Sequence, residues 1–333
     1  MKIIKTFILL IAIATIYASF LNNESSEIQA ILYKDFNTAS YTESSTTRFK
    51  NFNMDFPNIS LTTMPIRAMV SKYYFLGEQY TKALELINES TNSNPYIMYN
   101  ESIKFEIYDA LQVQDSALYY SERAFTGIPN NQKHFIELAK AYVNEDRYEK
   151  LDSMFKIVKR TNIPVIWQFY LASILSDESK ISDYGKKIAF EALDKYPGED
   201  YPQVNLAAQY VAVGTDNVKE GIELDNKAEL KYNEGNYIEA GGIWEEAANL
   251  NYIDYTYFEN AGSSYYNAGD FDRAIKNFKH VIDSLNPKTG KSEYLIALSY
   301  NSIGNKERAC YYAVQSSRQD YNRAFQLASE YCD

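Results

Sequence analysis

The chain has 333 residues, a hydrophobic share of 46% and a formal net charge of −11, which supports one extended solenoid or two domains. The acidic balance and the lack of a dense Lys/Arg run after the first few residues argue against binding to nucleic acid or to an anionic membrane surface. The sequence holds 2 histidines and 2 cysteines and shows no metal-ligand spacing, so we expect no metal, no cofactor and no enzymatic activity.

Residues 1–21 have the pattern of a targeting segment. Lys2 and Lys5 precede an apolar run, Phe7 to Leu21, which suits a signal-peptide core and is short for a spanning helix of about 20 residues. Cleavage after Ala18 and retention as an anchor both stay open. Either way, the positive-inside rule sends the remaining chain across the membrane. We therefore expect an exported or membrane-anchored protein on the periplasmic side of a bacterial envelope.

Residues 22–65 show little regular pattern. One short helix is predicted over 27–36, and the stretch 38–47 is rich in Ser and Thr without any apolar period. We interpret this region as a linker followed by an irregular N-terminal cap.

A repeat of 34 residues begins near Ile66. Tyr74, Tyr108 and Tyr142 recur at this spacing, and Pro95 and Pro129 do so at the ends of units. A fixed period of this size indicates stacked helical hairpins. The first block is expected over 66–213, with units at about 66–97, 98–131, 132–164 and 165–198.

A break is predicted after this block. A helix over 203–213 ends at Gly214, and residues 214–221 lack an apolar period. We interpret 214–221 as a hinge or boundary between two blocks.

The second block, 222–318, carries the clearest repeat. Gly235, Ala240 and Trp244 are followed 34 residues later by Gly269, Ala274 and Phe278. The glycine is expected to end a first helix with positive φ. The small residue lets two antiparallel helices approach, and the aromatic fills the space beyond. Three units are expected at 222–253, 254–288 and 289–318, followed by a capping helix within 319–333.

The order of these positions resembles the tetratricopeptide repeat. Tyr265, Gly269, Phe271, Ala274 and Phe278 follow the family pattern in one unit, and the resemblance covers about residues 66–318. It implies an all-α, right-handed superhelical solenoid of antiparallel helix pairs, with about seven units and a C-terminal capping helix. Such a solenoid needs a capped end.

The resemblance also implies that first helices line a concave face. In the second block this face would present a ladder of amides and phenols for an extended peptide, with carboxylates that favour a neutral or basic ligand. The alternative is that the Asn residues only cap helix ends. The candidate partner-binding residues are Asp225, Glu229, Tyr232, Asn233, Glu259, Tyr266, Asn267 and Asn301.

Two further features leave alternatives open. The 31 tyrosines are accounted for by repeat positions or by a Tyr-lined groove for peptide or glycan. Cys310 and Cys332 are the only cysteines, and in an exported protein they are expected to pair and pin the cap to the solenoid, the alternative being two buried thiols.

The sequence therefore predicts a non-enzymatic scaffold that binds another protein or peptide segment in a concave groove. The alternatives are an accessory factor of surface polysaccharide assembly or secretion, and a Tyr-rich glycan-binding protein. Fold does not decide between them.

Overall fold

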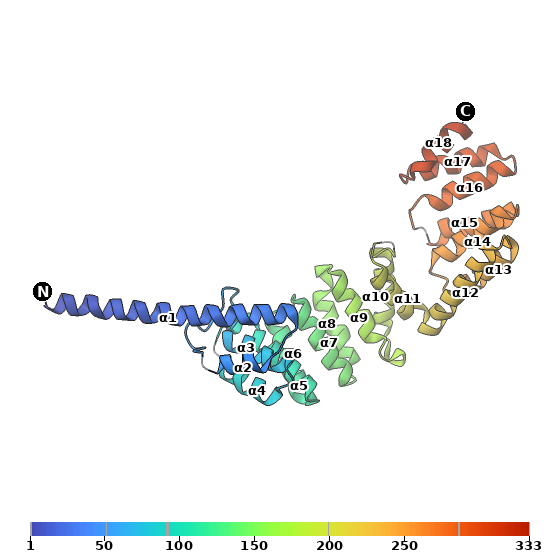
Figure 1. Cartoon of the computed structure of the whole chain (residues 1–333). Coiled ribbons are helices and arrows are strands. Elements are labelled where there is room, and N and C mark those ends of the chain that lie inside the picture. Colours follow the sequence, from blue (N-terminus) through green and yellow to red (C-terminus); the bar gives the residue numbers. More distant parts are fainter. Residues whose placement is uncertain (1, 51, 91–92, 199, 286, 333) are drawn as a thin grey trace. The chain divides into compact units, whose positions relative to one another are not determined.

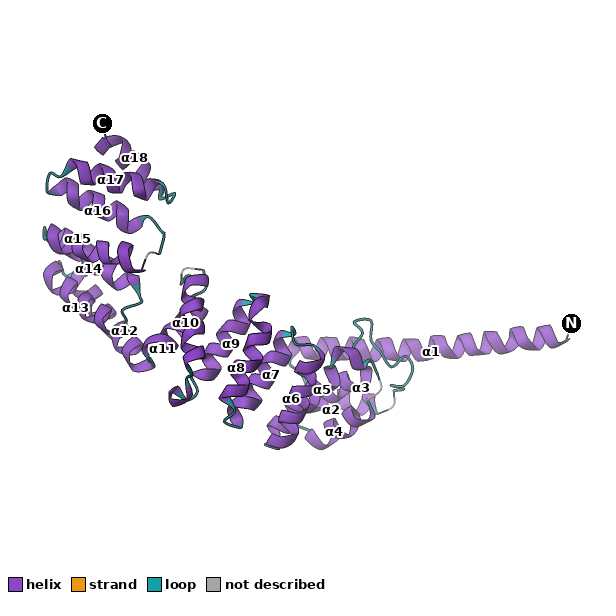
Figure 2. Cartoon of the chain, turned by 180° about the vertical axis from the view of Figure 1, so that it is seen from behind, coloured by secondary structure: helices purple, strands orange, loops and turns teal. Residues whose placement is uncertain are grey.

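The computed structural model describes residues 2–50, 52–90, 93–198, 200–285 and 287–332. Within these ranges the secondary structure is helical, with no strand (Figure 2), so the all-α class is confirmed. The chain divides into two compact units, residues 1–176 and 177–333. Each unit is described by itself.

The first unit contains nine α-helices and two 3₁₀ turns in its described part (Figure 1). They are α1 Lys2–Thr38, α2 Glu43–Phe49, α3 Ile66–Leu76, α4 Tyr80–Glu89, η1 Pro95–Ile97, α5 Tyr99–Ala110, α6 Gln114–Gly127, α7 Gln132–Asn144, α8 Tyr148–Val158, η2 Lys159–Thr161 and α9 Pro164–Ile174. The hairpins α3–α4, α5–α6 and α7–α8 are the first three predicted repeats.

The second unit is likewise helical in its described residues. It comprises η3 Glu178–Lys180, α10 Asp183–Lys195, α11 Pro202–Val213, α12 Thr215–Asn233, α13 Tyr237–Leu250, α14 Tyr255–Asn267, α15 Phe271–His280, the π-helical η4 Val281–Leu285, α16 Lys291–Ser302, α17 Lys306–Ser317 and α18 Asn322–Cys332. Successive helices pack in order from α10 to α18. The predicted unit 165–198 is divided, because α9 ends the first compact unit and α10 begins the second.

Helix α1 corrects the expectation of a linker after residue 21. It runs unbroken from Lys2 to Thr38, and one face of its second half is buried in the first unit. The buried positions are Leu21, Ser25, Ile28, Gln29, Leu32 and Asp35. This spacing of three, four and seven residues is that of an amphipathic helix. The amphipathic pattern of this half of α1 is not visible in the sequence, because three of its buried residues are polar.

Tertiary contacts explain why those polar residues are buried. Asp35 Oδ2 accepts hydrogen bonds from Ser45 Oγ at 2.7 Å and Tyr73 Oη at 3.0 Å. Gln29 Oε1 accepts from the backbone N–H of Leu61 at 3.1 Å. Asp35 and Gln29 therefore find partners outside the helix, and Ser25 Oγ accepts from Gln29 Nε2 within it at 3.2 Å, which offsets the cost of their desolvation.

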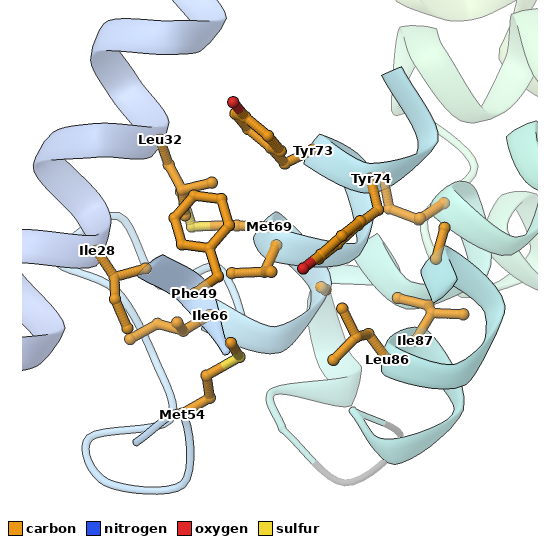
Figure 3. Packing of buried hydrophobic residues seen from close by; sticks show 14 of the residues in the cluster. Ile28, Leu32, Phe49, Met54, Ile66, Met69, Tyr73, Tyr74, Leu86 and Ile87 are labelled. Carbon is orange, nitrogen blue, oxygen red and sulfur yellow. The ribbon is translucent and has the colours of Figure 1, made fainter. Parts of the chain in front are cut away.

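The apolar core of the first unit begins at α1. Ile28 and Leu32 of α1 pack with Phe49, Ile66 and Met69 in one buried cluster (Figure 3). The second half of α1 therefore covers the end of the solenoid, which is the task predicted for an irregular cap.

The turns within the hairpins have a left-handed residue at one repeat position. In the second unit this residue is Gly235, Gly269 or Gly304, with φ between +76° and +82°. The positive φ predicted for Gly235 and Gly269 is confirmed. In the first unit the same position is held by Glu78, Gln112 and Asp146, with φ between +56° and +61°.

The segment 214–221 is helical, not broken. Gly214 has a φ of +96°, and α12 starts at the next residue and continues to Asn233. Val218 and Gly221 are buried. The segment lacks an apolar period because only these two residues face the core. Whether it acts as a hinge stays a prediction.

The packing positions of the second unit lie where the repeat pattern requires them. Ala240 and Ala274 are fully buried, and so is Phe278. A Cβ atom built on Gly262 would lie 2.6 Å from a ring carbon of Phe278, so only glycine lets these helices approach so closely. Beyond the last hairpin, α18 packs on α17, and a disulfide joins Cys310 to Cys332.

Candidate functional site

The predicted ladder in the second unit is connected internally. Asn267 Nδ2 donates to the hydroxyl of Tyr232 at 2.6 Å, which links neighbouring first helices. The rings of Tyr266 and Phe271 pack edge to face with centroids 5.5 Å apart. Asn233, Asn301 and Glu229 are exposed. Their role in binding a partner stays a prediction.

Two predicted carboxylates have structural partners. Glu259 is buried, and its Oε1 accepts from Ser292 Oγ at 2.6 Å while its Oε2 binds Lys291 Nζ at 2.7 Å. Asp225 Oδ1 accepts from the indole Nε1 of Trp244 at 2.7 Å. These bonds tie helices within the second unit together, and both carboxylates keep internal partners in this structure.

Buried tyrosines repeatedly donate to a carboxylate. Three of these bonds join consecutive hairpins, from the first helix of one to the second helix of the hairpin before it. They are Tyr142 to Glu122 at 3.2 Å, Tyr170 to Asp152 at 2.6 Å and Tyr265 to Glu245 at 3.0 Å. Tyrosine thus fills repeat positions in the core, which is the simpler of the two explanations of the Tyr excess.

An open hollow of about 820 Å³ lies within the first unit. Its lining comes from α3, α5 and α7, which are the first helices of three consecutive hairpins. Phe75, Phe105 and Ile136 supply apolar surface. The polar lining residues are Glu106, Asp109, Asn131, Gln132, Lys133, Glu137 and Lys140. The hollow therefore has the place that the resemblance gives to a partner groove, but in the other block.

Most charges around the hollow are paired. Lys133 Nζ lies 3.0 Å from Glu106 Oε1, and Lys140 Nζ lies 2.6 Å from Asp109 Oδ2. Lys72, on α3, also forms an ion pair with Glu106. Burial lowers the pKa of Lys72, and the neighbouring Glu106 partly offsets this effect. These ion pairs leave little net charge among the lysines and their partners.

Glu137 is paired through only one of its two carboxylate oxygens. It is only 5% exposed, and its Oε1 accepts from Ser102 Oγ at 2.6 Å and lies 3.5 Å from Lys133 Nζ. Its Oε2 is buried and has no hydrogen-bond partner. Burial raises the pKa of Glu137 to about 7. A buried acceptor without a partner is costly, and a donor that reached this oxygen would gain an interaction that the free protein lacks.

Sequence reasoning did not select this site. A signal was present, because Lys72, Glu106 and Lys140 are each 34 residues apart and so occupy one repeat position with alternating charge. A charge ladder at one position of successive first helices predicts neighbouring ion pairs, and the pair Lys72–Glu106 forms, whereas Lys140 pairs with Asp109 of the same neighbouring helix. Glu137 itself carries no sequence signal, since its burial depends on the fold.

No cluster of His, Cys, Asp or Glu suited to a metal ion occurs among the described residues. The hollow therefore offers apolar contact, paired charges and one unsatisfied carboxylate.

The helix pairs, their 34-residue period and their packing positions are those of a tetratricopeptide-repeat fold. No family model matches the sequence, and no curated protein sequence matches it. Several solved structures are similar in fold. A tetratricopeptide repeat protein from Parabacteroides merdae is 14% identical, with a TM-score of 0.35, over 93% of this chain and 100% of that one. PilW, described as a type IV pilus biogenesis factor, is 17% identical with a TM-score of 0.28, over 78% and 96% of the two chains.

Proposed function

We propose that this protein is a membrane-anchored, non-enzymatic scaffold of a bacterial envelope that holds a segment of a partner protein in the hollow of its first unit. The observation that carries the proposal is a hollow lined by Phe105, Ile136 and Glu137, in which the buried Oε2 of Glu137 has no hydrogen-bond partner. A peptide segment with an N–H or cationic donor next to an apolar side chain complements both features.

The anchor half of the proposal rests on α1. Residues 4–17, 19 and 20 are exposed, and α1 is the one helix among the described residues that is long and apolar enough to cross a membrane, with a mean hydropathy of 2.1 in its most apolar window. The fifteen residues from 6 to 20 span about 23 Å, somewhat less than the hydrocarbon thickness of about 30 Å, a difference that local thinning of the bilayer can accommodate. Lys2 and Lys5 then lie on the cytoplasmic side.

A hollow-filling variant tests the partner site. Ala110 lines the hollow at the exposed end of α5, so Ala110→Trp fills the space without entering the core. Ser153→Trp, on the exposed face of α8, is the matched control. Affinity capture from native membranes should recover the same stoichiometric protein with wild type and Ser153→Trp but not with Ala110→Trp. Equal recovery with all three would refute the site.

The mass of the mature protein tests the anchor. We expect the intact N-terminus in the membrane fraction after alkaline extraction, because α1 continues from the apolar segment into the core of the first unit. A soluble product that lacks residues 1–18 would show that the segment is a cleaved signal.

A further inference from the structure

Two neighbouring loops of the first unit carry the most exposed large apolar side chains among its described residues. Leu61 is 96% exposed on the α2–α3 loop, and Tyr96 is 84% exposed on the α4–α5 connection. Phe56, on the first loop, is 55% exposed. A soluble surface gains nothing from holding such side chains out in water.

The two loops are bonded to each other. Asn94 Nδ2 donates to the carbonyl oxygen of Thr63 at 2.7 Å, and Asn58 Nδ2 donates to Ser93 Oγ at 3.2 Å. The stretches that carry these side chains are also free of charge, since residues 56–65 and 93–99 contain no Asp, Glu, Lys or Arg, and Asp55, which precedes the first stretch, is paired with Arg67. In a chain with a net charge of −11, this neutral, apolar pair of loops is a distinct surface, which we call the loop pair.

The loop pair is attached to α1. Leu61 N–H bonds to Gln29 Oε1, and the hydroxyls of Tyr33 and Thr62 lie 2.9 Å apart. In Figure 3, Ile28 lies below Leu32 on α1 and Met54 lies below both, so the α2–α3 loop leaves α2 toward the exposed half of α1. Figure 1 shows this loop beside α1.

The distance to the bilayer is short if α1 is the anchor. Gln29 is eight residues beyond Leu21, about 12 Å along the helix. The headgroup layer occupies about 5–8 Å on each side of the hydrocarbon core. A tilt toward the loops of about 20°, which is ordinary for a spanning helix, lowers them further toward this layer. Tyrosine with an apolar ring and a polar tip is typical of it.

We propose that the loop pair is a second membrane contact, which inserts Leu61, Phe56 and Tyr96 into the lipid headgroup layer beside α1. This inference rests on the anchor proposed above. The two contacts together fix the rotation and tilt of the first unit on the bilayer. A single helix alone would leave that unit free to rotate about the membrane normal.

Depth-dependent quenching in vesicles tests the inference on the full chain. Single cysteines are introduced as Leu61→Cys, Tyr96→Cys, Ile13→Cys and Tyr119→Cys, and labelled with an environment-sensitive fluorophore without reductant, so that the Cys310–Cys332 disulfide stays intact. Each protein is reconstituted into phosphatidylcholine vesicles with lipids spin-labelled in the headgroup or deep in the acyl chain. Tyr119 is 54% exposed on α6 and is the water-exposed control.

The labels at positions 61 and 96 should shift to shorter emission wavelengths and be quenched by the headgroup spin label, with position 119 unaffected. Position 13 should be quenched by the deep label. If position 13 is quenched but positions 61 and 96 behave like position 119, the loop contact is refuted and the anchor stands. If position 13 is not quenched, the anchor itself fails. A wavelength shift without lipid quenching also refutes the inference, because it indicates contact with protein.

Discussion

The two units close their ends and build their turns with different chemistry. The first unit covers its N-terminal end with the packed half of α1, whose buried polar residues bond to neighbouring segments. The second unit covers its C-terminal end with α18 and joins that helix to α17 by a disulfide. The first cap depends on tertiary burial, whereas the second depends on a covalent bond that an oxidising compartment preserves.

A second contrast lies in the hydrogen bonds between neighbouring hairpins. Each unit bridges neighbouring first helices with a Ser–Glu hydrogen bond of 2.6 Å, Ser102 to Glu137 in one and Ser292 to Glu259 in the other. Lys291 binds the second oxygen of Glu259 at 2.7 Å, but the second oxygen of Glu137 has no partner. In the second unit, both carboxylate oxygens of the bridging Glu therefore have partners. In the first unit, one of the two oxygens has no hydrogen-bond partner.

The units can be followed separately because each holds one buried tryptophan, Trp167 in the first and Trp244 in the second. Replacing either by Phe leaves a fluorescence signal from the other unit alone. Denaturant unfolding of variants that keep a single tryptophan therefore reports the stability of each unit separately.

Removing the disulfide should have the largest effect. The loop it closes has a sequence separation of 22, which corresponds to about 3 kcal/mol in the chain-entropy picture. Cys310→Ala with Cys332→Ala should lower the unfolding midpoint reported by Trp244 and leave the Trp167 transition unchanged. Equal midpoints with and without the disulfide would show that α18 is held by packing alone.

Glu259→Gln should destabilise the second unit by about 2–3 kcal/mol, because it removes a buried charge that binds both Ser292 and Lys291. The Trp244 signal should report the loss. Glu246→Gln is a control on α13, where the side chain is exposed. The assignment of Glu259 as a structural residue fails if both variants unfold alike.

Glu137→Gln should stabilise the first unit, and the gain in the free energy of unfolding should depend on pH. The folded pKa of about 7 exceeds the ordinary value of 4.5 for an exposed Glu, so the native state binds the proton more tightly than the unfolded state. The stability of the first unit should therefore fall as pH rises from about 4.5 through 7. Above pH 8 the variant should be more stable than wild type, on the order of 2 kcal/mol.

The charged groups around Glu137 sharpen the test of this pH dependence. Lys133 opposes the rise in the pKa of Glu137, and Glu106 adds to it, while Lys72 faces the same carboxylates from α3. In the Trp167 background, wild type should lose stability across this range and Glu137→Gln should not. Parallel pH profiles for the two proteins would assign the pH dependence to another group.

Substitutions at the left-handed turn residues should give the smallest changes in the free energy of unfolding. Glu78→Gly and Gln112→Gly should each stabilise the first unit by up to about 1 kcal/mol, because their left-handed φ strains a side-chain-bearing residue. Asp146→Gly should gain less, since Asp tolerates this conformation. Gly235→Ala should destabilise the second unit by about 1 kcal/mol, although a Cβ there meets nothing within 4 Å. Loss of stability in all four variants would remove the contrast between the turns.

The sequence predicted what the repeat period determines. The hairpins, the glycine turns at Gly235 and Gly269, and the burial of Ala240 and Phe278 follow from local spacing. The second half of α1 could not be predicted, because Gln29 and Asp35 become suitable for burial only through partners distant in sequence. For the same reason Glu259 was selected as a candidate binding residue although its partners lie on α16.

The hollow shows the same limit. Its helices were expected as first helices of repeats, but its position in the first unit depends on how Phe105 and Ile136 of neighbouring hairpins stand beside Glu137. Periodicity gives the register of these residues and cannot give the space that remains between them.

The tyrosine–carboxylate bonds have a consequence for how such a repeat chain can evolve. In three places the acid belongs to one hairpin and the phenol to the next, and two of these pairs are separated by 20 residues. Each of these three borders between hairpins is therefore a matched chemical junction. Recombination that cuts within loops and preserves this spacing can add, delete or exchange whole hairpins, because the new neighbours still supply one acid and one phenol.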